Sequence, residues 1–194
     1  MAVLTADHYI ADTLSFRKVL ADAQTAAQAG FLVTLGIPPS FASTGYGYIQ
    51  KGESIPLESD QPVFRAQRFI EKPEAEEAAR MASSGEFFWN SGMFIWRASR
   101  LLEELQRQMP EFHSQLMEVE ASMPNPQEYA ATLARVWPQV SEQTIDYGVM
   151  ERAREVAMIP ARIGWTDVGS WSSLFELMPR DPAGNIFLGP HETL

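Results

Sequence analysis

The 194-residue sequence contains no cysteine, which excludes a disulfide framework, a thiol nucleophile and a cysteine-ligated zinc site. It contains three histidines, His8, His113 and His191, which lie far apart and show none of the spacings of a histidine metal site. Basic residues are also scarce, since 15 Lys and Arg stand against 25 Asp and Glu, giving a net charge of −10. We therefore expect neither nucleic acid nor an anionic membrane as a partner, because both need a basic surface.

Long apolar runs are absent too. No run approaches the length that spans a bilayer, and the N-terminus lacks the basic-then-apolar order of a signal peptide. We expect a cytoplasmic protein with no membrane partner. The remaining composition, 45% hydrophobic and 21% charged, is that of a globular protein with a substantial core. A small anionic substrate would need a local cation or a bound metal to offset the negative charge.

Strand and helix patterns alternate in the first part of the chain. The short apolar run 2–4 predicts a buried strand that needs neighbours on both sides. An amphipathic helix is predicted over 14–29, and Gly30 suits the position after it. The apolar run 31–37 then predicts a strand buried on both faces. This order is typical of an α/β fold with parallel pairing in its first part.

The rest of the chain predicts a hairpin, an aromatic strand and several helices. The expected elements are a hairpin tip over 51–61, a strand over 63–70, a helix over 74–84, a loop and buried strand over 87–96, a helix capped by Ser99, a proline-broken helical insertion or lid over 110–138 without chemistry, a helix from 144, strands over 156–160 and 163–167, and a helix over 171–178 capped by Ser170. We expect residues 1–180 to form one domain, and 181–194 to be a linker or the start of a β segment.

Polar residues recur at the ends of the predicted strands, where ligands bind in open α/β sheets. The strand over 63–70 ends in Glu71-Lys72-Pro73, which is either an ordinary surface ion pair or a phosphate-binding lysine beside an acid. Asp7 follows the first strand, although it can equally cap the turn into the next helix. Asp167 is the last residue of the predicted strand over 163–167.

Three further positions suggest contacts to a polar ligand. Gly45 and Gly47, which flank Tyr46, either let the backbone approach a ligand or mark a kinked strand. Asn90 lies among aromatic residues just before Gly92, and a buried asparagine must be fully hydrogen-bonded. Asp146 lies in the first turn of a helix, where it can simply complement the helix dipole.

Together these side chains suggest a sugar phosphate that reacts at a nucleotide. Two carboxylates, Asp7 and Asp167, are the usual protein share of a Mg²⁺ site that substrate phosphates complete. Lys72 can neutralise a phosphate, while Glu71 and Asn90 offer hydrogen bonds to hydroxyl groups.

The sequence resembles the sugar-1-phosphate nucleotidyltransferases, most closely the mannose-1-phosphate guanylyltransferases. The resemblance rests on segments in the family's order from residue 3 to about 190: Thr5-Ala6-Asp7-His8, Leu32-Val33-Thr34-Leu35-Gly36-Ile37, Thr44-Gly45-Tyr46-Gly47-Tyr48-Ile49, Phe69-Ile70-Glu71-Lys72-Pro73, Trp89-Asn90-Ser91-Gly92-Met93-Phe94, Ile145-Asp146-Tyr147-Gly148-Val149-Met150-Glu151 and Trp165-Thr166-Asp167-Val168-Gly169-Ser170-Trp171. It implies a Rossmann-like mixed sheet with a helical insertion, and the reaction of GTP with mannose 1-phosphate to give GDP-mannose and pyrophosphate.

The resemblance also implies residue roles. Asp7 and Asp167 would hold Mg²⁺, and Lys72 would contact the sugar phosphate. Glu71 and Asn90 would bind the sugar hydroxyls, assisted by the backbone of 45–47 and by Gly92. Asp146 would lie near the sugar pocket.

Some family features are missing or altered. The glycine-rich N-terminal signature that wraps the triphosphate is absent, so we expect a catalytic domain truncated at its N-terminus that is inactive and poorly stable alone. Thr5 replaces a proline and Gly148 a commoner alanine. Three readings stay open: a sibling enzyme for another hexose phosphate or nucleotide, a non-catalytic sugar-phosphate-binding or regulatory subunit, and an α/β domain with ordinary caps and ion pairs. A homodimer is compatible with the sequence, which does not set the oligomeric state.

Overall fold

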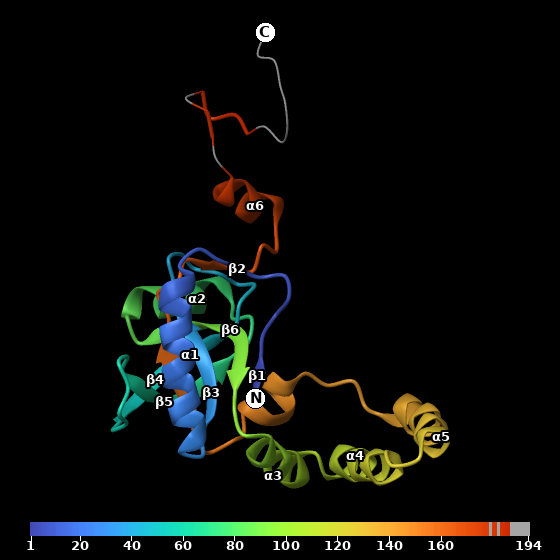
Figure 1. Ribbon diagram of the computed structural model, residues 1–194. Coiled ribbons are helices and arrows are strands. Elements are labelled where there is room, and N and C mark those ends of the chain that lie inside the picture. The colour runs from blue at the N-terminus through green and yellow to red at the C-terminus, as the bar shows by residue number, and fades with distance from the viewer. Residues whose placement is uncertain (179, 182, 187–194) are drawn as a thin grey trace.

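Six strands form the main sheet of the computed structural model, which describes residues 1–178, 180–181 and 183–186 (Figure 1). In spatial order the strands are β1 (Ala2–Val3), β6 (Phe87–Ile95), β3 (Leu32–Ile37), β7 (Val156–Pro160), β5 (Val63–Ile70) and β4 (Tyr48–Ile55). β3 and β7 pair in parallel, whereas β6 runs antiparallel to both β1 and β3, and β5 to both β7 and β4. The predicted mixed sheet is confirmed, but the parallel pairing expected for the first part is limited to one pair.

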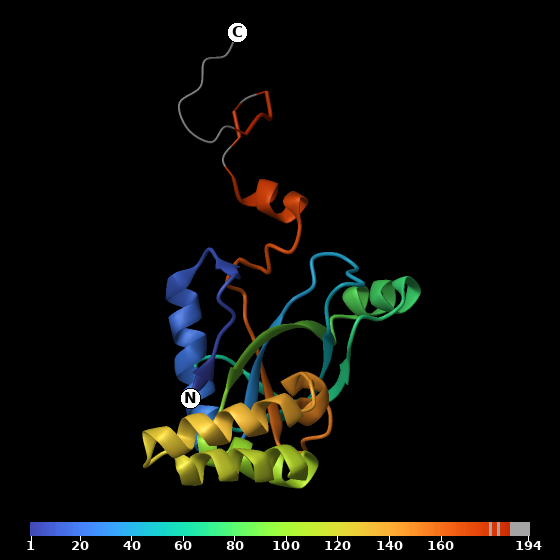
Figure 2. The same cartoon turned by 90° about the vertical axis from the view of Figure 1, so that its right-hand side faces the viewer.

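Strand β6 is the long, bent element that closes this sheet. Its first residues, Phe87 to Trp89, pair with β4, and its later residues pair with β3. The pairings therefore run in a ring from β6 through β3, β7, β5 and β4 back to β6. The arch of β6 across the sheet is visible in Figure 2. The segment expected as a loop followed by a strand is thus strand throughout, and the bend brings Asn90 between β3 and β4.

Strand β1 corrects the prediction of a buried first strand. Ala2 and Val3 are both exposed, and β1 pairs with β6 alone at the edge of the sheet. A short apolar run predicts a buried strand, but the sequence does not show whether neighbouring strands lie on both sides of it or on one side only. β3, by contrast, is buried at all six residues, as the sequence predicts.

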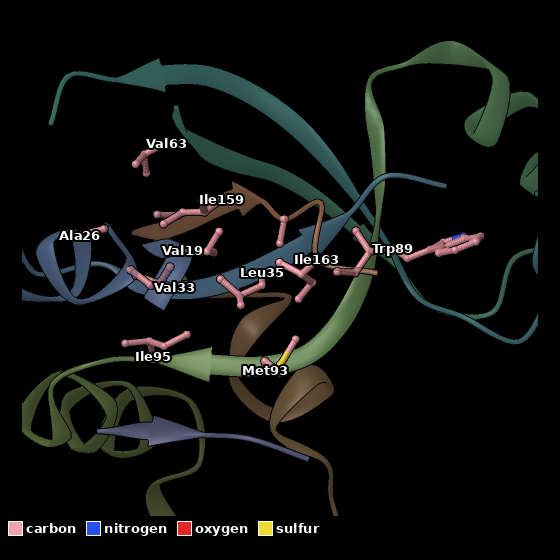
Figure 3. Packing of buried hydrophobic residues seen from close by; sticks show 14 of the residues in the cluster. Val19, Ala26, Val33, Leu35, Val63, Trp89, Met93, Ile95, Ile159 and Ile163 are labelled. Atoms are coloured by element: carbon pink, nitrogen blue, oxygen red, sulfur yellow. The ribbon is translucent and has the colours of Figure 1, made fainter. Parts of the chain in front are cut away.

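Side chains alternate between the two faces of the sheet and form two core clusters. Val33 and Leu35 of β3 point into the first cluster with helices α1 (Thr13–Gln28) and α2 (Ala75–Ser84), as Figure 3 shows for α1. Leu32 points to the opposite cluster, which includes Leu105 and Val149. Both helices lie close to their predicted positions. Asp12 caps α1 by accepting from the Ser15 N–H at 2.9 Å, and Gly30 after it has φ +101°.

The segment predicted as a helical insertion over 110–138 forms α4 (Pro110–Ser122), α5 (Pro126–Val136) and the short η1 (Trp137–Gln139). The separately predicted helix α3 (Ala98–Gln108) leads directly into it, and we call α3, α4, α5 and η1 together the helical insertion. Pro110 and Pro126 begin helices rather than break them, because proline suits the first helical turn. Ser99 is not the cap of α3; Arg97 occupies that position without a side-chain cap bond. In Figure 1, α4 and α5 extend away from the sheet.

A second, two-stranded sheet joins β2 (Tyr9–Ile10) to β8 (Trp165–Thr166). β2 is absent from the sequence prediction, and β8 is shorter than the predicted strand. Ser170 caps α6 (Trp171–Leu177) as predicted, accepting from the Ser173 N–H at 3.1 Å. The predicted β segment beyond Ile186 lies outside the described residues. Within the described part of the chain, no helix is long and apolar enough to cross a membrane.

Candidate active site

A cavity of about 310 Å³ lies where β5, β6, β8 and their loops meet. Its lining residues are Thr5, His8, Gly45, Tyr46, Gly47, Glu71, Lys72, Asn90, Ser91, Gly92, Thr144, Asp146, Tyr147, Trp165 and Asp167. Every site residue that the sequence singles out is in this set except Asp7. Segments separated by more than 100 residues therefore meet at one cavity, as their order in the sequence led us to expect.

Strand pairing brings the glycine segment against the end of β5. Tyr48 pairs with Ile70, which places Gly47 beside Glu71. A Cβ atom at Gly47 would collide with the Glu71 carboxylate, so only glycine lets that side chain lie so close to the backbone. The next residue, Lys72, has φ +46°, a region that costs a non-glycine residue free energy. None of the ion pairs between described residues includes Lys72.

Asn90 is the centre of a hydrogen-bond network. Its Oδ1 accepts from Thr34 Oγ1 and from the Gly92 N–H, both at 3.2 Å. Its Nδ2 donates to Asp146 Oδ1 at 2.7 Å. These bonds fix the orientation of the amide, since the oxygen receives donors and the nitrogen faces a carboxylate. Asp146 begins a π-helix, η2 (Asp146–Met150), where a regular helix was expected.

Asp167 is held by the aromatic side of the cavity. Tyr46 donates its hydroxyl to Asp167 Oδ1 at 2.7 Å, and the Gly169 N–H donates to the same oxygen at 3.2 Å. Val168, which lies between Asp167 and Gly169 in the sequence, has φ +52°, which is rare for a β-branched residue. The Tyr46 ring also packs edge-on against Trp89 and Trp165. The carboxylate is thus pre-oriented by contacts from two segments 121 residues apart in sequence.

Asp7 lies differently from the sequence expectation. It is exposed and does not line the cavity, although Thr5 and His8 on either side of it do. A loop rather than a buried strand end carries it, because β1 already ends at Val3. Its assignment as a metal ligand stays a prediction.

Five lining residues with polar side chains were not named as site residues from the sequence: Thr5, His8, Ser91, Thr144 and Tyr147. Trp165 was likewise not named, although its motif was quoted. It donates Nε1–H to His8 Nδ1 at 3.0 Å, so Nδ1 acts as an acceptor in this contact. His8, Tyr147 and Trp165 are large or titratable residues inside the quoted motifs, which is the signal that could have found them; Thr5, Ser91 and Thr144 carry no such signal.

Glu71 is a residue of the cavity whose pKa is clearly affected by its surroundings. Burial raises the pKa of Glu71, and the nearby Asp146 and Glu151 carboxylates add to this rise, while Lys72 opposes it. An acid with a raised folded-state pKa contributes stability below its ordinary pKa and loses that contribution as pH rises through the folded-state value. Glu71 therefore destabilises the fold at neutral pH, a cost that is typical of functional sites.

Replacing Glu71 by glutamine should accordingly stabilise the protein in a pH-dependent way. The variant should melt at a higher temperature than the wild type at pH 7 to 8, and the two should converge near pH 4. Thermal melts across this range measure the effect. Glu86→Gln removes the same charge from an exposed position outside the cavity and should show no such widening gap. A difference in melting temperature between Glu71→Gln and the wild type that does not change with pH would contradict the raised pKa of Glu71.

Comparisons with known proteins agree with this geometry. The nucleotidyl transferase family model matches residues 1–183. The mannose-1-phosphate guanylyltransferase of Escherichia coli K12 is 41% identical over 189 residues, covering 97% of this chain and 40% of the relative. That of Salmonella montevideo is 39% identical over 191 residues, with 97% and 40% coverage.

A solved structure resembles the whole arrangement. The crystal structure described as mannose-1-phosphate geranyltransferase from Thermus thermophilus superposes with a TM-score of 0.81 at 34% identity, covering 97% of this chain and 52% of that one. The predicted nucleotidyltransferase type of mixed sheet is therefore confirmed. The chain spans about 40% of the length of the curated relatives it matches.

Proposed function

We propose, since the chain belongs to the nucleotidyl transferase family, that its cavity serves guanylyl transfer from GTP to mannose 1-phosphate, giving GDP-mannose and pyrophosphate. The observation that carries the proposal is the convergence of Lys72, Asn90 and Asp167 on one cavity. A phosphate oxygen of the sugar phosphate attacks the α-phosphorus of GTP, and the bond to pyrophosphate breaks. Such transfer depends on positioning and charge stabilisation rather than on a protein nucleophile.

The sugar end of the cavity is the side of Glu71 and Asn90. The Asn90 amide has two N–H donors and gives one to Asp146, which leaves the other for a sugar hydroxyl. The Glu71 carboxylate, pressed against Gly47, can accept from hydroxyl groups. The backbone of 45–47 and Gly92 completes this side, and Asp146 acts through Asn90.

Lys72 is the cation proposed to contact the sugar phosphate. It lines the cavity and forms no ion pair within the described residues, so its ammonium can meet an anionic ligand. Its placement beside Glu71 at the end of β5 puts a phosphate site next to the hydroxyl-binding carboxylate. A sugar phosphate presents those two groups together.

The oxygen ligands present fit Mg²⁺. Oδ1 of Asp167 is occupied by Tyr46 and Gly169, and Oδ2 is the atom left for a cation. Asp7, on its exposed loop, is the second proposed ligand. No cluster of three or more potential metal ligands occurs in the described residues. Mg²⁺ is usually held by one or two carboxylates plus substrate phosphates, so the substrate would have to complete the proposed site. When bound, the ion would neutralise the charge of the triphosphate. Cytoplasmic location and a homodimer remain predictions from the sequence.

The direct test is pyrophosphate release from GTP, mannose 1-phosphate and Mg²⁺. The chain is assayed as printed and with an extension upstream in its reading frame. A panel of other sugar 1-phosphates and nucleotides identifies a sibling specificity. Activity with this substrate pair supports the proposal. Sugar-phosphate binding without turnover in either form would instead indicate a binding or regulatory protein.

Tyr46→Phe should lower the affinity of the site for Mg²⁺ without unfolding the site. Removing the hydroxyl leaves Asp167 with one fewer orienting bond, and such outer contacts typically cost about 10- to 100-fold in metal affinity. The measurement is the Mg²⁺ concentration for half-maximal nucleotide binding. Tyr147→Phe removes a hydroxyl from the same cavity without touching Asp167 and is the matched control. Equal effects of both variants would refute the role of Tyr46.

A further inference from the structure

Glu104 is a buried carboxylate that has no part in the proposed reaction. It is 1% exposed and lies in α3, just before the segment 110–138 that the sequence predicts to be without chemistry. Arg100 and Arg107 donate to it from the neighbouring turns, and so does the side-chain amide of Gln108. Burial alone would raise the pKa of Glu104, but the hydrogen bonds from Gln108, Arg100 and Arg107 outweigh it and hold that pKa below its ordinary value. The carboxylate is therefore a fixed anion inside the helix cluster.

Gln108 extends this cluster toward the cavity. Its Nε2 also donates to the backbone carbonyl of Val149 in η2, at 3.3 Å. Its Oε1 is buried without a hydrogen-bond partner among the described residues. An unpaired buried carbonyl is costly, so the orientation of the amide is explained by its two donor contacts and not by its oxygen.

A second contact joins the insertion to the same π-helix. Gly148 packs against Met109, close enough that a Cβ atom there would lie 2.6 Å from the Met109 sulfur. The wide turn of η2 is closed by the Glu151 N–H, which donates to the Asp146 carbonyl at 2.9 Å. Wide turns of this kind often occur at functional sites. The first residue of η2 is Asp146, whose carboxylate meets Asn90 in the cavity.

We propose that Gln108 is a positioning residue through which the helical insertion sets the geometry of the sugar-phosphate pocket. Glu104 holds the Gln108 amide, the amide holds the Val149 carbonyl, and η2 in turn places Asp146 against Asn90. The inference rests on the proposed function, because it assigns a ligand to the pocket that the insertion positions. It gives the helical insertion a part in substrate binding that the sequence does not indicate.

The test compares three substitutions at Gln108, two apolar and one that keeps donors. Gln108→Met removes both donors at nearly constant size, with Gln108→Leu as a second apolar variant. Gln108→Lys restores donors for both Glu104 and Val149, and it removes the unpaired oxygen. The matched control is Gln115→Met, since Gln115 donates to the backbone carbonyl of Gln139 in the same insertion without reaching η2.

Two readouts are needed: calorimetric affinity for mannose 1-phosphate, and hydrogen exchange of the peptide covering 144–152. Gln108→Met should weaken affinity about tenfold and speed exchange in that peptide, which is the scale of coupling mutations outside a ligand site. Gln108→Lys should recover both, and Gln115→Met should change neither. The folded fraction of each variant is checked by its melting curve.

The outcomes separate this inference from the proposed function. Wild type that binds no mannose 1-phosphate, either as printed or with its upstream extension, overturns the proposed function, and the exchange data alone then decide whether Gln108 holds η2. Wild type that binds, with unchanged exchange in Gln108→Met and Gln108→Leu, overturns the inference. Faster exchange without loss of affinity also overturns it, since Gln108 would then support only the fold.

Discussion

Asp167→Asn is expected to lower guanylyl transfer by about 10³-fold or more, because it removes the negative charge best placed to hold Mg²⁺. The substituted side chain keeps an oxygen that can still accept from Tyr46 and from the Gly169 N–H. The melting temperature should therefore stay close to that of the wild type. The measurement is pyrophosphate release at increasing Mg²⁺, in whichever form of the chain supports transfer.

Asp60→Asn is the control for this experiment. Asp60 is exposed and lies outside the cavity, so the same loss of charge there should leave the rate within a factor of about two, as for ordinary surface substitutions. Restoration of the Asp167→Asn rate by high Mg²⁺ would indicate a weakened rather than a lost metal ligand. Full activity of Asp167→Asn would remove the basis for the metal assignment.

The sequence was sufficient where strong local signals agree. β3 is six consecutive buried residues bounded by Gly30 and Pro38, and β5 ends at the residue predicted because Pro73 follows soon after. Glu71 and Asp167 could be singled out because each lies at the end of a predicted strand, and they do line one cavity with Asn90. That Asn90 reaches this cavity from the bend within β6, and Asp167 from the second sheet, could not be predicted.

What could not be predicted depends on partners distant in sequence. β2 is a two-residue strand whose pairing partner, β8, lies near the other end of the chain, so no local pattern marks it. The exposure of β1 follows from its place at the edge of the sheet, which no local pattern specifies. The bond from Tyr46 to Asp167 likewise joins segments whose proximity only the closed sheet creates. Periodicity predicts a helix near Asp146, but its π-type turn is coupled to packing against Met109.

The site residues thus carry strain and unfavourable charge that the surrounding fold holds in place. Lys72 and Val168 are the two non-glycine residues of the described chain with positive φ, and both lie beside proposed ligand-binding carboxylates. Glu71 is destabilising in its charged form at neutral pH. Strain concentrated at these positions is a cost that folding alone would not maintain, which is consistent with a functional origin.

Lys72→Gly is expected to separate stability from function. Losing the ammonium should lower kcat/KM for mannose 1-phosphate by about 10²-fold, the scale of one lost charged contact to the reacting phosphate. The positive φ costs a non-glycine residue about 1–2 kcal/mol, whereas glycine costs about 0.5–1 kcal/mol through its freer unfolded chain. The melting temperature should therefore be unchanged or slightly higher. Steady-state kinetics and thermal melts on one preparation test both parts.

Two comparisons make this result specific. Lys72→Arg keeps the charge and the strain, so it should retain part of the activity at unchanged stability. Arg68→Gln removes a cation outside the cavity from β5, the strand that Lys72 follows, and should leave kcat/KM nearly unaltered. If Arg68→Gln lowers kcat/KM as much as Lys72→Gly does, then Lys72 acts through the overall electrostatic potential of the protein and not through a contact to the phosphate. A drop in melting temperature for Lys72→Gly would show that the lysine side chain contributes to the fold, because relief of backbone strain alone predicts the opposite sign.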